Sequence, residues 1–490
     1  MANSDLFSTA GSRLTSPKVS FWVPGRIELL GKHTDYCGGR SLLCAVDRGF
    51  AVCAEPLAPN SDVEILTAFP NDPNTTLRVA LPLSPTVLQQ DIDQLRASKS
   101  WALYPAIVLH RLLTNFSATT PFRISVACNL PPASGMSTSS AVVCYMWLVV
   151  SFFNKLQESP KYKQFFGDDE GKLYTYLGNC ENGRDFIVPS VGVLEGSAGV
   201  GTFGGSEDHT AIMSGSEGEI KMWSFAPTTH ISTASLPPSV TFVIAVSGAM
   251  AEKTKGAMSD YNDAAMLALY GVMYYCVGVD VDVDVDVDVD VDDFAGTTPP
   301  SNFAEVIAHS KNAGNRNVRN CVSQKIREGY KSPDAAGIIR KIFPSLEPPA
   351  ADSKITSEDV VTRWLQFYDE SEVLVPSALA AFASSNWDDL GRIVDSSHSA
   401  TVSKLQNTIP ETAWLPEEAR RLGAIASSAF GAGFGGSCYA LVLKEDAREF
   451  KRKWEEAYAS EFPIEGGEGR LPRLFFETGA SAGASKISHA

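Results

Sequence analysis

Acidic, basic and imidazole side chains crowd one short stretch near the N-terminus. The stretch RIELLGKHTDYCGG (26–39) contains Arg26, Glu28, Lys32, His33 and Asp35, and it follows the apolar run FWVPG. Such groups can orient hydroxyls and move protons when a fold holds them together. The glycines in the stretch let the backbone turn closely around a ligand. The cluster therefore marks a candidate site for polar-ligand or acid–base chemistry.

A second stretch, LPPASGMSTSSA (130–141), runs directly into a strongly apolar segment. Small residues at a helix start leave backbone N–H groups bare, and together with the helix dipole these donors suit a phosphate group. Serine hydroxyls can also bind Mg²⁺. The stretch lacks the Gly-Lys-Ser/Thr of a Walker A loop. The alternative is a buried helix that a serine merely caps.

Two further stretches are rich in glycine. GAGFGGSCYALV (431–442) precedes an apolar strand, where glycines allow close approach to a ligand or to another backbone. A tight loop without a ligand is the alternative. GVGTFGGSEDHTAIMSG (199–215) brings Glu207, Asp208 and His209 together, and a carboxylate there can orient or deprotonate a hydroxyl. Its alternative is a solvated acidic turn.

The elements that position these stretches follow from their patterns of apolar residues. Strands are expected at 19–25, ending at Pro24-Gly25, and at 41–57, 120–128 and 239–248. Residues 136–156 are apolar on nearly every side, which predicts a helix buried all round. Residues 358–405 have helical periodicity with breaks, and 424–458 predict a glycine-rich loop, a strand and a helix. The closing GASAGASKISHA predicts a frayed or loosely docked tail.

Composition bounds the class of protein. A chain of 490 residues with 44% apolar and 20% charged residues predicts two to three globular domains. The net charge of -16 argues against nucleic acid or an anionic membrane as the main partner, although a site can still be locally positive. Nine scattered cysteines without a CxxC pair favour reduced thiols over disulfides or zinc. With no signal peptide and no apolar run long enough to span a bilayer, we expect a cytoplasmic protein.

One segment is of low complexity. Val279 to Asp292 is seven consecutive Val-Asp pairs. The alternation fits a strand with one acidic face, but seven like charges on that face would repel each other. We expect an acidic surface insertion at 278–296 that is mostly disordered and carries no chemistry.

In this order, the stretches resemble the GHMP kinases and, within them, the galactokinases. PGRIELLGKHTDYCGG is similar to the galactokinase sugar motif PGR-x-N-L-I-G-E-H-T-D-Y-N-G-G. LPPASGMSTSSA resembles the phosphate loop LP-x-G-x-G-L-S-S-S-A, and GAGFGGSCYALV resembles the third glycine motif. SDYN (259–262) resembles the segment that brings a tyrosine to the sugar, and GGSEDH (204–209) stands where the family reads C-G-I-M-D-Q. The likeness spans roughly residues 20 to 445.

The resemblance implies a role for each matching residue. Asp35 and His33 would hydrogen-bond the hydroxyls of a sugar, each of which needs a directed donor or acceptor. Asp208 falls on the catalytic aspartate and would orient or deprotonate the anomeric hydroxyl. Arg26 would stabilise charge on the transferring phosphoryl group and keep that aspartate ionised. The other sugar contacts implied are Lys32, Gly205 and Tyr261.

The phosphate loop implies ATP as the donor and Mg²⁺ as its counter-ion. Ser139 falls on the Mg²⁺-binding serine. Glu181, in CENG, best matches the second Mg²⁺ ligand, with Glu195 as competitor because the segment between Glu181 and Asp208 is longer than the family's spacing. The residues implied in binding ATP are Pro131, Ser134, Gly135, Ser137, Thr138, Ser139, Ser140, Gly433 and Gly435.

The sequence departs from the family where the sugar is recognised. Lys32 replaces the glutamate that the family associates with the C6 hydroxyl of galactose, and Glu28 replaces an asparagine. Lysine cannot accept a hydrogen bond but can pair with a carboxylate, so galacturonate is one candidate substrate. Alternatively, Lys32 turns away or pairs with Glu28 and the sugar is neutral, which we favour. Ala133 replaces a phosphate-loop glycine, and His209 replaces a glutamine.

The resemblance implies an α+β, two-domain GHMP kinase fold. A ribosomal-S5-like N-terminal domain (15–235) and a ferredoxin-like C-terminal domain (236–480) would enclose the active site. The expected activity is ATP-dependent phosphorylation of a monosaccharide, galactose or a close relative, at its anomeric hydroxyl. The rivals are a galacturonate kinase, a non-catalytic sugar sensor and a kinase of non-sugar alcohols. We expect a monomer with small-molecule partners only, although the sequence does not reveal the oligomeric state.

Overall fold

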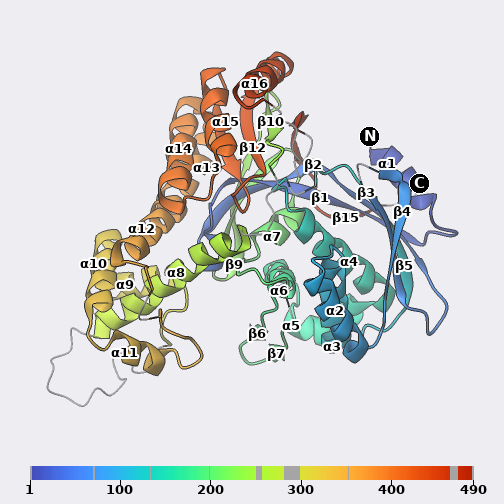
Figure 1. Cartoon of the computed structure of the whole chain (residues 1–490), viewed down its shortest axis with the longest axis horizontal. Helices are drawn as coiled ribbons and strands as arrows, with labels where there is room; N and C mark the ends of the chain where they lie inside the picture. The colour runs from blue at the N-terminus through green and yellow to red at the C-terminus, as the bar shows by residue number, and fades with distance from the viewer. Residues whose placement is uncertain are drawn as a thin grey trace.

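Two β-sheets and a helical lobe make up the molecule. The computed structural model describes residues 3–69, 72–132, 134–197, 199–249, 257–280, 298–350, 353–463 and 473–487. In Figure 1 the first sheet lies on one side, helices α8 to α12 form a lobe on the other, and the two termini lie close together. The N-terminal helix, α1 (Asn3–Gly11), packs on β2 and β5.

The larger sheet has nine strands within the described ranges. Its path runs β15-β1-β2-β5-β3-β4; β8 and β14 also pair with β2, and β9 pairs with β8. Strands β3 and β5 run parallel, whereas β1 and β2 form a long antiparallel pair. The bounds are β1 Val19–Leu30, β2 Arg40–Pro56, β3 Val63–Phe69, β4 Asp72–Leu81, β5 Phe122–Cys128, β8 Glu219–Phe225, β9 Thr228–Ser235, β14 Ala480–Ser481 and β15 Ser485–Ile487.

Strand β1 is buried at every position because helices cover the sheet where it runs. Helices α4 and α7 both contact β1 and β2, and α2, α3 and α6 pack behind α4 and α7. The short hairpin β6 (Phe186–Val188) and β7 (Gly192–Leu194) follows α6. The helix bounds are α2 Pro85–Ala97, α3 Leu103–Phe116, α4 Thr138–Asn154, α5 Pro160–Phe165, α6 Glu170–Asn182 and α7 Glu207–Ser214.

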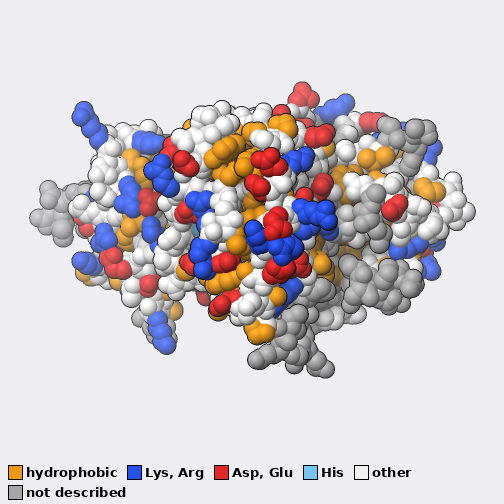
Figure 2. Space-filling view, turned by 90° about the horizontal axis from the view of Figure 1, so that it is seen from above, with side chains coloured by type: hydrophobic (Ala, Val, Ile, Leu, Met, Phe, Trp, Pro, Cys, Tyr) orange, Lys and Arg blue, Asp and Glu red, His pale blue; other side chains and the backbone are white. Residues whose placement is uncertain are grey.

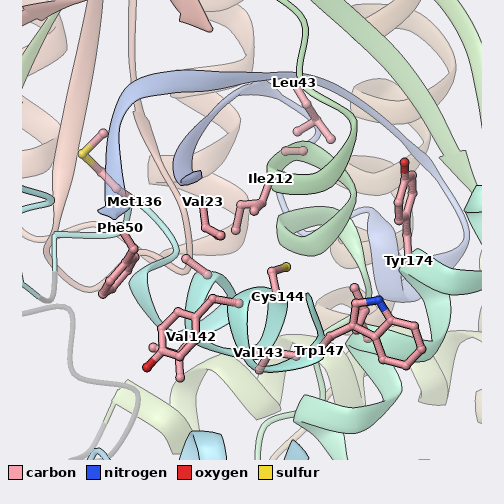
Figure 3. Close-up of a cluster of buried hydrophobic side chains, with 14 of the residues drawn as sticks. Val23, Leu43, Phe50, Met136, Val142, Val143, Cys144, Trp147, Tyr174 and Ile212 are labelled. Atoms are coloured by element: carbon pink, nitrogen blue, oxygen red, sulfur yellow. The ribbon is translucent and has the colours of Figure 1, made fainter. Parts of the chain in front are cut away.

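Helix α4 is the centre of the largest core. Figure 3 shows Val143, Cys144 and Trp147 of this helix among side chains from other elements, with Val23 of β1 and Ile212 of α7 beside them. Burying a side chain of this size removes enough apolar surface from water to stabilise the fold by about 1.5 to 3 kcal/mol. The helix that carries the phosphate-loop serines is therefore a rigid base for them.

The second sheet has four antiparallel strands in the order β11-β12-β10-β13. Helices α14 and α15 contact β11, and α16 contacts β10, β12 and β13. The bounds are β10 Val240–Val246, β11 Ala426–Phe430, β12 Ser437–Leu443, β13 Leu474–Thr478, α13 Val375–Ala383, α14 Trp387–Ala400, α15 Pro410–Arg421 and α16 Ala447–Glu461.

The helical lobe has a core of its own. Val272, Phe303, Val322 and Trp364 are buried there, one from each of four helices. Six-residue and five-residue π-helical segments, Asp369–Leu374 and Thr401–Leu405, follow α12 and α14. The helix bounds are α8 Ala257–Asp280, α9 Phe303–Asn312, α10 Val318–Lys331, α11 Ala335–Ile342 and α12 Ser357–Tyr368.

Most elements expected from the sequence form, but three expectations are wrong. Strand β1 does not end at Pro24-Gly25; its register shifts there, which accommodates a proline without an N–H, and the strand continues to Leu30. Residues 426–430, before the glycine-rich loop, form β11. The closing segment is not a loose tail: β14 pairs with β2 and β15 pairs with β1, so residues 480–487 complete the larger sheet.

The Val-Asp tract falls mainly outside the described residues. Helix α8 runs to Asp280, so the first three residues of the expected 278–296 insertion belong to a helix. Residues 281–297 are not described. The expectation that this tract is a disordered insertion stays a prediction, as does the domain boundary at 235/236.

The net charge of -16 does not gather into one acidic face in the view of Figure 2, where Lys and Arg side chains alternate with Asp and Glu. Among the described residues, every helix is too short or too polar to cross a membrane.

Candidate active site

The 31–39 loop follows β1 and leads into β2. Gly31 opens it with φ of +114°, and a Cβ there would lie 2.3 Å from Ser41 Oγ, so a side chain does not fit. Thr34 Oγ1 donates to the Gly31 carbonyl at 2.9 Å and closes the turn. His33, whose own φ is +57°, and Asp35 then line a cavity next to the loop.

Arg26 of β1 and Asp208, in the first turn of α7, meet at this cavity. Arg26 Nη2 lies 2.7 Å and Nε 2.9 Å from Asp208 Oδ1. Arg26 Nη1 also donates to the Gly135 carbonyl in the phosphate loop. Burial lowers the pKa of Arg26, but Asp208, Glu28 and Glu207 outweigh burial and raise it overall. The guanidinium therefore stays charged and joins the carboxylate to the phosphate loop.

The cavity brings together residues from all four stretches singled out in the sequence. In this conformation it encloses about 50 Å³, room for a few water molecules. Its lining residues are Arg26, Glu28, His33, Asp35, Ser140, Glu181, Asn182, Thr202, Gly204, Gly205, Glu207, Asp208, His209, Tyr261, Gly431 and Ala432.

Carboxylates dominate the cavity wall: Glu28, Asp35, Glu181, Glu207 and Asp208 face it. Burial raises the pKa of Asp35, and Asp208 and Glu28 raise it further, although two backbone N–H groups oppose the shift. Burial, together with Glu28, Asp35 and Asp208, raises the pKa of Glu207 well above its usual value. The site is thus electrostatically prepared for a cation or for hydroxyl donors, and it opposes a further anion.

Aromatic rings and glycines shape the part of the cavity next to the 31–39 loop. The ring of Tyr261, from α8, lies 4.9 Å from that of His33. His33 Nδ1 lies 2.8 Å from Tyr36 Oη. A Cβ on Gly205 would lie 2.4 Å from Asp35 Oδ2, so only glycine allows this close approach. The structure therefore brings His33, Asp35, Gly205 and Tyr261 together, as the resemblance implies.

The phosphate loop and the glycine-rich 431–436 loop pack directly on each other. Ser437 Oγ donates to the Ser134 carbonyl at 2.7 Å, and Ser134 Oγ donates to the Pro131 carbonyl at 2.8 Å. A Cβ on Gly431 would lie 2.7 Å from the Gly135 carbonyl oxygen. Gly433 and Gly435 are left-handed, with φ of +83° and +131°. The turn itself therefore requires glycine at these positions, whether or not a ligand binds.

Two phosphate-loop hydroxyls have no partner in the described structure. The side-chain oxygens of Ser137 and Thr138 are buried and make no hydrogen bond with the described residues. Both stand at the N-terminus of α4, where Ser137 makes no side-chain cap hydrogen bond and the first-turn N–H groups have no acceptor within the helix. Because buried donors are normally satisfied, these hydroxyls and N–H groups fit an anionic ligand such as a phosphate.

Ser139 and Glu181 are the expected metal ligands, but in the structure Ser140 takes the place of Ser139 beside Glu181. Ser140 Oγ lies 2.8 Å from Glu181 Oε2 and 3.4 Å from Asp208 Oδ2, and all three line the cavity. Ser139 is half-buried and does not line it. Glu195, the competitor of Glu181, is exposed outside the cavity.

His209 Nε2 lies 3.0 Å from Glu181 Oε2, which helps to fix that carboxylate. No group of three His, Cys, Asp or Glu within the described ranges forms a complete metal cage. Mg²⁺ does not need one, since it usually takes one or two carboxylates and completes its shell with water and phosphate oxygens. The Ser140, Glu181 and Asp208 oxygens fit this requirement.

Lys32 does not line the cavity. Its side chain is 2% exposed, and its Nζ lies 3.2 Å from Glu28 Oε1 and 3.2 Å from the Glu28 carbonyl oxygen. Glu28 Oε2 in turn accepts from the Gly431 N–H at 3.1 Å. The structure therefore corrects the placement of Lys32 among the sugar contacts: Glu28 faces the cavity, and Lys32 neutralises it from behind.

Residues far away in the sequence hold the 31–39 loop, and the sequence analysis missed them. Arg363 of α12 donates to the His33 carbonyl at 2.6 Å, and Gln366 donates to the Lys32 carbonyl at 3.0 Å. Glu370 accepts from the Gly31 N–H at 2.8 Å. These residues lie in a helical stretch whose periodicity indicates only burial, so no local signal identifies them.

Comparisons with known proteins agree with this geometry. The family model "GHMP kinases C terminal" matches residues 378–460, and the "Galactokinase galactose-binding signature" matches residues 10–56. The galactokinase of Staphylococcus carnosus is 29% identical over 142 residues, which are 29% of this chain and 34% of that protein. The galactokinase of Clostridium tetani is 25% identical over 176 residues, 36% of this chain and 39% of that protein. The matched segments thus span little more than a third of these relatives.

The fold is matched over the whole chain. The crystal structure of Lactococcus lactis galactokinase complexed with galactose superposes with a TM-score of 0.64 at 16% identity, covering 99% of this chain and 100% of that one. The α+β fold expected from the resemblance is confirmed. The two family models each match a part of the chain, and the likeness to the Lactococcus lactis galactokinase shows the fold.

Proposed function

We propose that this protein catalyses the ATP-dependent phosphorylation of a neutral monosaccharide, galactose or a close relative, at its anomeric hydroxyl. The observation that carries the proposal is the Arg26–Asp208 pair, which lies in the wall of a polar cavity and is bonded to the phosphate loop through Gly135. The galactose-binding signature covers Arg26, His33 and Asp35, which supports a sugar as the acceptor.

Within this proposal, Asp208 orients the reacting hydroxyl and accepts its proton, while Arg26 keeps Asp208 ionised and faces the transferring group. His33, Asp35 and Glu28 offer the donors and acceptors that a ring of hydroxyls requires. Phosphoryl transfer depends mainly on positioning and on charge stabilisation, and these residues can supply both.

The nucleotide phosphates would lie at the start of α4, where Ser137 and Thr138 offer hydroxyls and the helix offers N–H groups. Ser140, Glu181 and Asp208 would hold Mg²⁺, which neutralises phosphate charge when bound. The surplus of carboxylates in the cavity wall supports a requirement for such a cation.

The cavity favours a neutral sugar over galacturonate. The cation that suggested a uronate, Lys32, is already paired with Glu28. Burial, and after it the neighbouring carboxylates, raise the pKa values of Asp35 and Glu207 in the same wall. A further carboxylate would add to that repulsion.

The test is ADP release with galactose, galacturonate, arabinose and N-acetylgalactosamine, with ³¹P NMR of the product. We expect the highest kcat/KM with galactose or another neutral sugar, and a sugar 1-phosphate as product. Turnover with galacturonate above that of every neutral sugar would contradict the substrate class. Binding of ATP and sugar without ADP release would instead indicate a sensor.

A further inference from the structure

A second cavity, of about 650 Å³, lies beside the first. Helix α8 provides one wall with Ala265, Leu269 and Val272, and Phe203 and Phe303 contribute aromatic rings. This volume is in the range of small-molecule sites, and the wall is mainly apolar, as in such sites. The proposed kinase reaction makes no use of it.

One unpaired cation lies at this cavity. Arg184 lines it, and its guanidinium makes no hydrogen bond or ion pair with any described residue. Arg184 is an exposed residue. Neighbouring protein atoms nevertheless lower its pKa, against the opposing effect of Tyr261 and Asp35. A planar guanidinium offers two parallel donors to a carboxylate or sulfonate, and an apolar surrounding strengthens that bond. Glu347, the acid of the same cavity, is exposed as Arg184 is.

The two cavities share a wall through Tyr36. This ring lines the second cavity, and its hydroxyl lies 2.8 Å from His33 Nδ1, in the first cavity. Arg363 Nη2 donates to the same hydroxyl at 3.1 Å. Phe203 and Gly204, adjacent in the chain, line the second and the first cavity respectively. A ligand that presses on Tyr36 or Phe203 therefore acts on the residues that face the sugar.

We propose that the second cavity binds a small amphipathic anion, with an apolar ring or chain along α8 and a carboxylate or sulfonate on Arg184, and that its occupancy changes the affinity for sugar through Tyr36 and His33. The binding half of this proposal is independent of the proposed kinase function. The coupling half depends on sugar binding at the first cavity.

The probe is 8-anilinonaphthalene-1-sulfonate, an aromatic anion that fluoresces in apolar sites. Titration of the full chain with saturating ATP is expected to show one site per chain. Arg184→Gln is expected to weaken binding about tenfold, the size of a charge-assisted bond, and Arg184→Lys less so. The neutral analogue N-phenyl-1-naphthylamine should bind equally to wild type and Arg184→Gln. Arg452→Gln, which removes an exposed cation of helix α16, should leave the affinity for the anion unchanged.

Ala265→Trp, which places an indole ring in the cavity, should weaken binding of both probes; circular dichroism checks that this variant folds. Equal affinity of the anion for wild type, Arg184→Gln and Ala265→Trp would overturn the site. For the coupling, calorimetry should show that the anion and galactose change each other's Kd by the same factor, as linkage requires. A galactose Kd that the anion leaves unchanged would overturn the coupling. A protein that does not bind galactose at all would contradict the proposed function, but it would not contradict the anion site.

Discussion

Arg26 and Asp208 are 182 positions apart in the chain, and their side chains form an ion pair of 2.7 Å in the cavity wall. The arginine comes from the strand that precedes the 31–39 loop, and the aspartate from the first turn of α7. Both elements pack on α4, whose first turn is the phosphate loop. One buried scaffold therefore sets the distance between the proposed base, its guanidinium partner and the nucleotide.

Asp208→Asn should lower kcat about 10²- to 10⁴-fold, because asparagine keeps the shape and still accepts from Arg26 but cannot take a proton. The KM for sugar should change little. ADP release measures both constants, and Glu195→Gln, an exposed acid outside the cavity, is the matched control. If Asp208→Asn kept kcat within a few-fold of wild type, proton transfer to Asp208 would not be part of the reaction.

Ser140 and Ser139 offer a paired test of the metal site. Ser140 contacts Glu181 and Asp208, whereas the alignment with the family motif points to Ser139. Ser140→Ala should raise the Mg²⁺ concentration for half-maximal turnover by at least about tenfold, as loss of groups around a metal does. Ser139→Ala should shift it much less. The opposite order, measured by Mg²⁺ titration of initial rates, would favour the alignment over the geometry.

Lys32 should matter for stability and not for the choice of sugar. Lys32→Met leaves Glu28 buried without its counter-ion, which costs about 3 to 5 kcal/mol when a buried pair is broken. The double variant Glu28→Gln, Lys32→Met should recover most of that loss. Urea unfolding of the two single variants and the double variant measures the coupling.

The preference of Lys32→Met for galactose over galacturonate should equal that of wild type, because the amino group does not face the cavity. A shift of this preference by tenfold or more would show that Lys32 reads the substrate after all.

Glu207→Gln should stabilise the protein at neutral pH. Burial and neighbouring acids raise the pKa of Glu207 in the folded state. The folded state therefore binds this proton more tightly than the unfolded state does. As the pH rises above 4.5, the usual pKa of a glutamate, the carboxyl group lowers the stability of the fold. Glutamine removes that cost and still accepts from Ser41. We expect a gain of about 1 to 3 kcal/mol at pH 8, as for an uncompensated buried group.

Below the ordinary pKa of glutamate the acid is protonated in both states, so the stability difference between Glu207→Gln and wild type should disappear near pH 4. Urea titrations at the two pH values make this comparison. Titrating groups far from Glu207 cancel because both proteins carry them, and the acids that interact with Glu207 contribute to the same charge effect. A difference independent of pH would mean that packing, not charge, separates the two proteins.

Local patterns explain which parts of the molecule the sequence predicts. Strands β2, β5 and β10 and helix α4 carry their own apolar periodicity, and Arg26, His33 and Asp208 stand in motifs that a single sequence displays. The motifs therefore predict that these residues belong to one site, and the structure places them around one cavity.

Features set by distant contacts could not be predicted in this way. Ser140 rather than Ser139 faces Glu181 because α4 packs on α6 in a rotation that buries Ser140 and leaves Ser139 half-buried. The tail 480–487 becomes sheet only because β1 and β2 offer free edges. The Lys32 side chain does not face the cavity because its amino group forms an ion pair with Glu28, four residues earlier in the chain.

Arg363 is the clearest case of such a distant contact, and we predict that it positions the 31–39 loop. Its side chain is 2% exposed and donates to the His33 carbonyl, to Tyr36 Oη and to the Ala264 carbonyl of α8. It therefore ties the loop to the helix that carries Tyr261. Arg363→Lys keeps the charge but loses the fork, so His33 and Tyr261 should lose their relative position.

We expect Arg363→Lys to raise the KM for sugar about tenfold, the cost of one charge-assisted hydrogen bond, while the KM for ATP and kcat change little. Tyr36→Phe, which removes one hydroxyl from the same network, should raise the KM for sugar by less and keeps the test open if Arg363→Lys unfolds. Arg319→Lys, in a half-buried bidentate pair with Asp369 of the same lobe, is the control. Equal loss of kcat and of affinity for both substrates would indicate general destabilisation, because a positioning residue for the sugar loop must act on the sugar first.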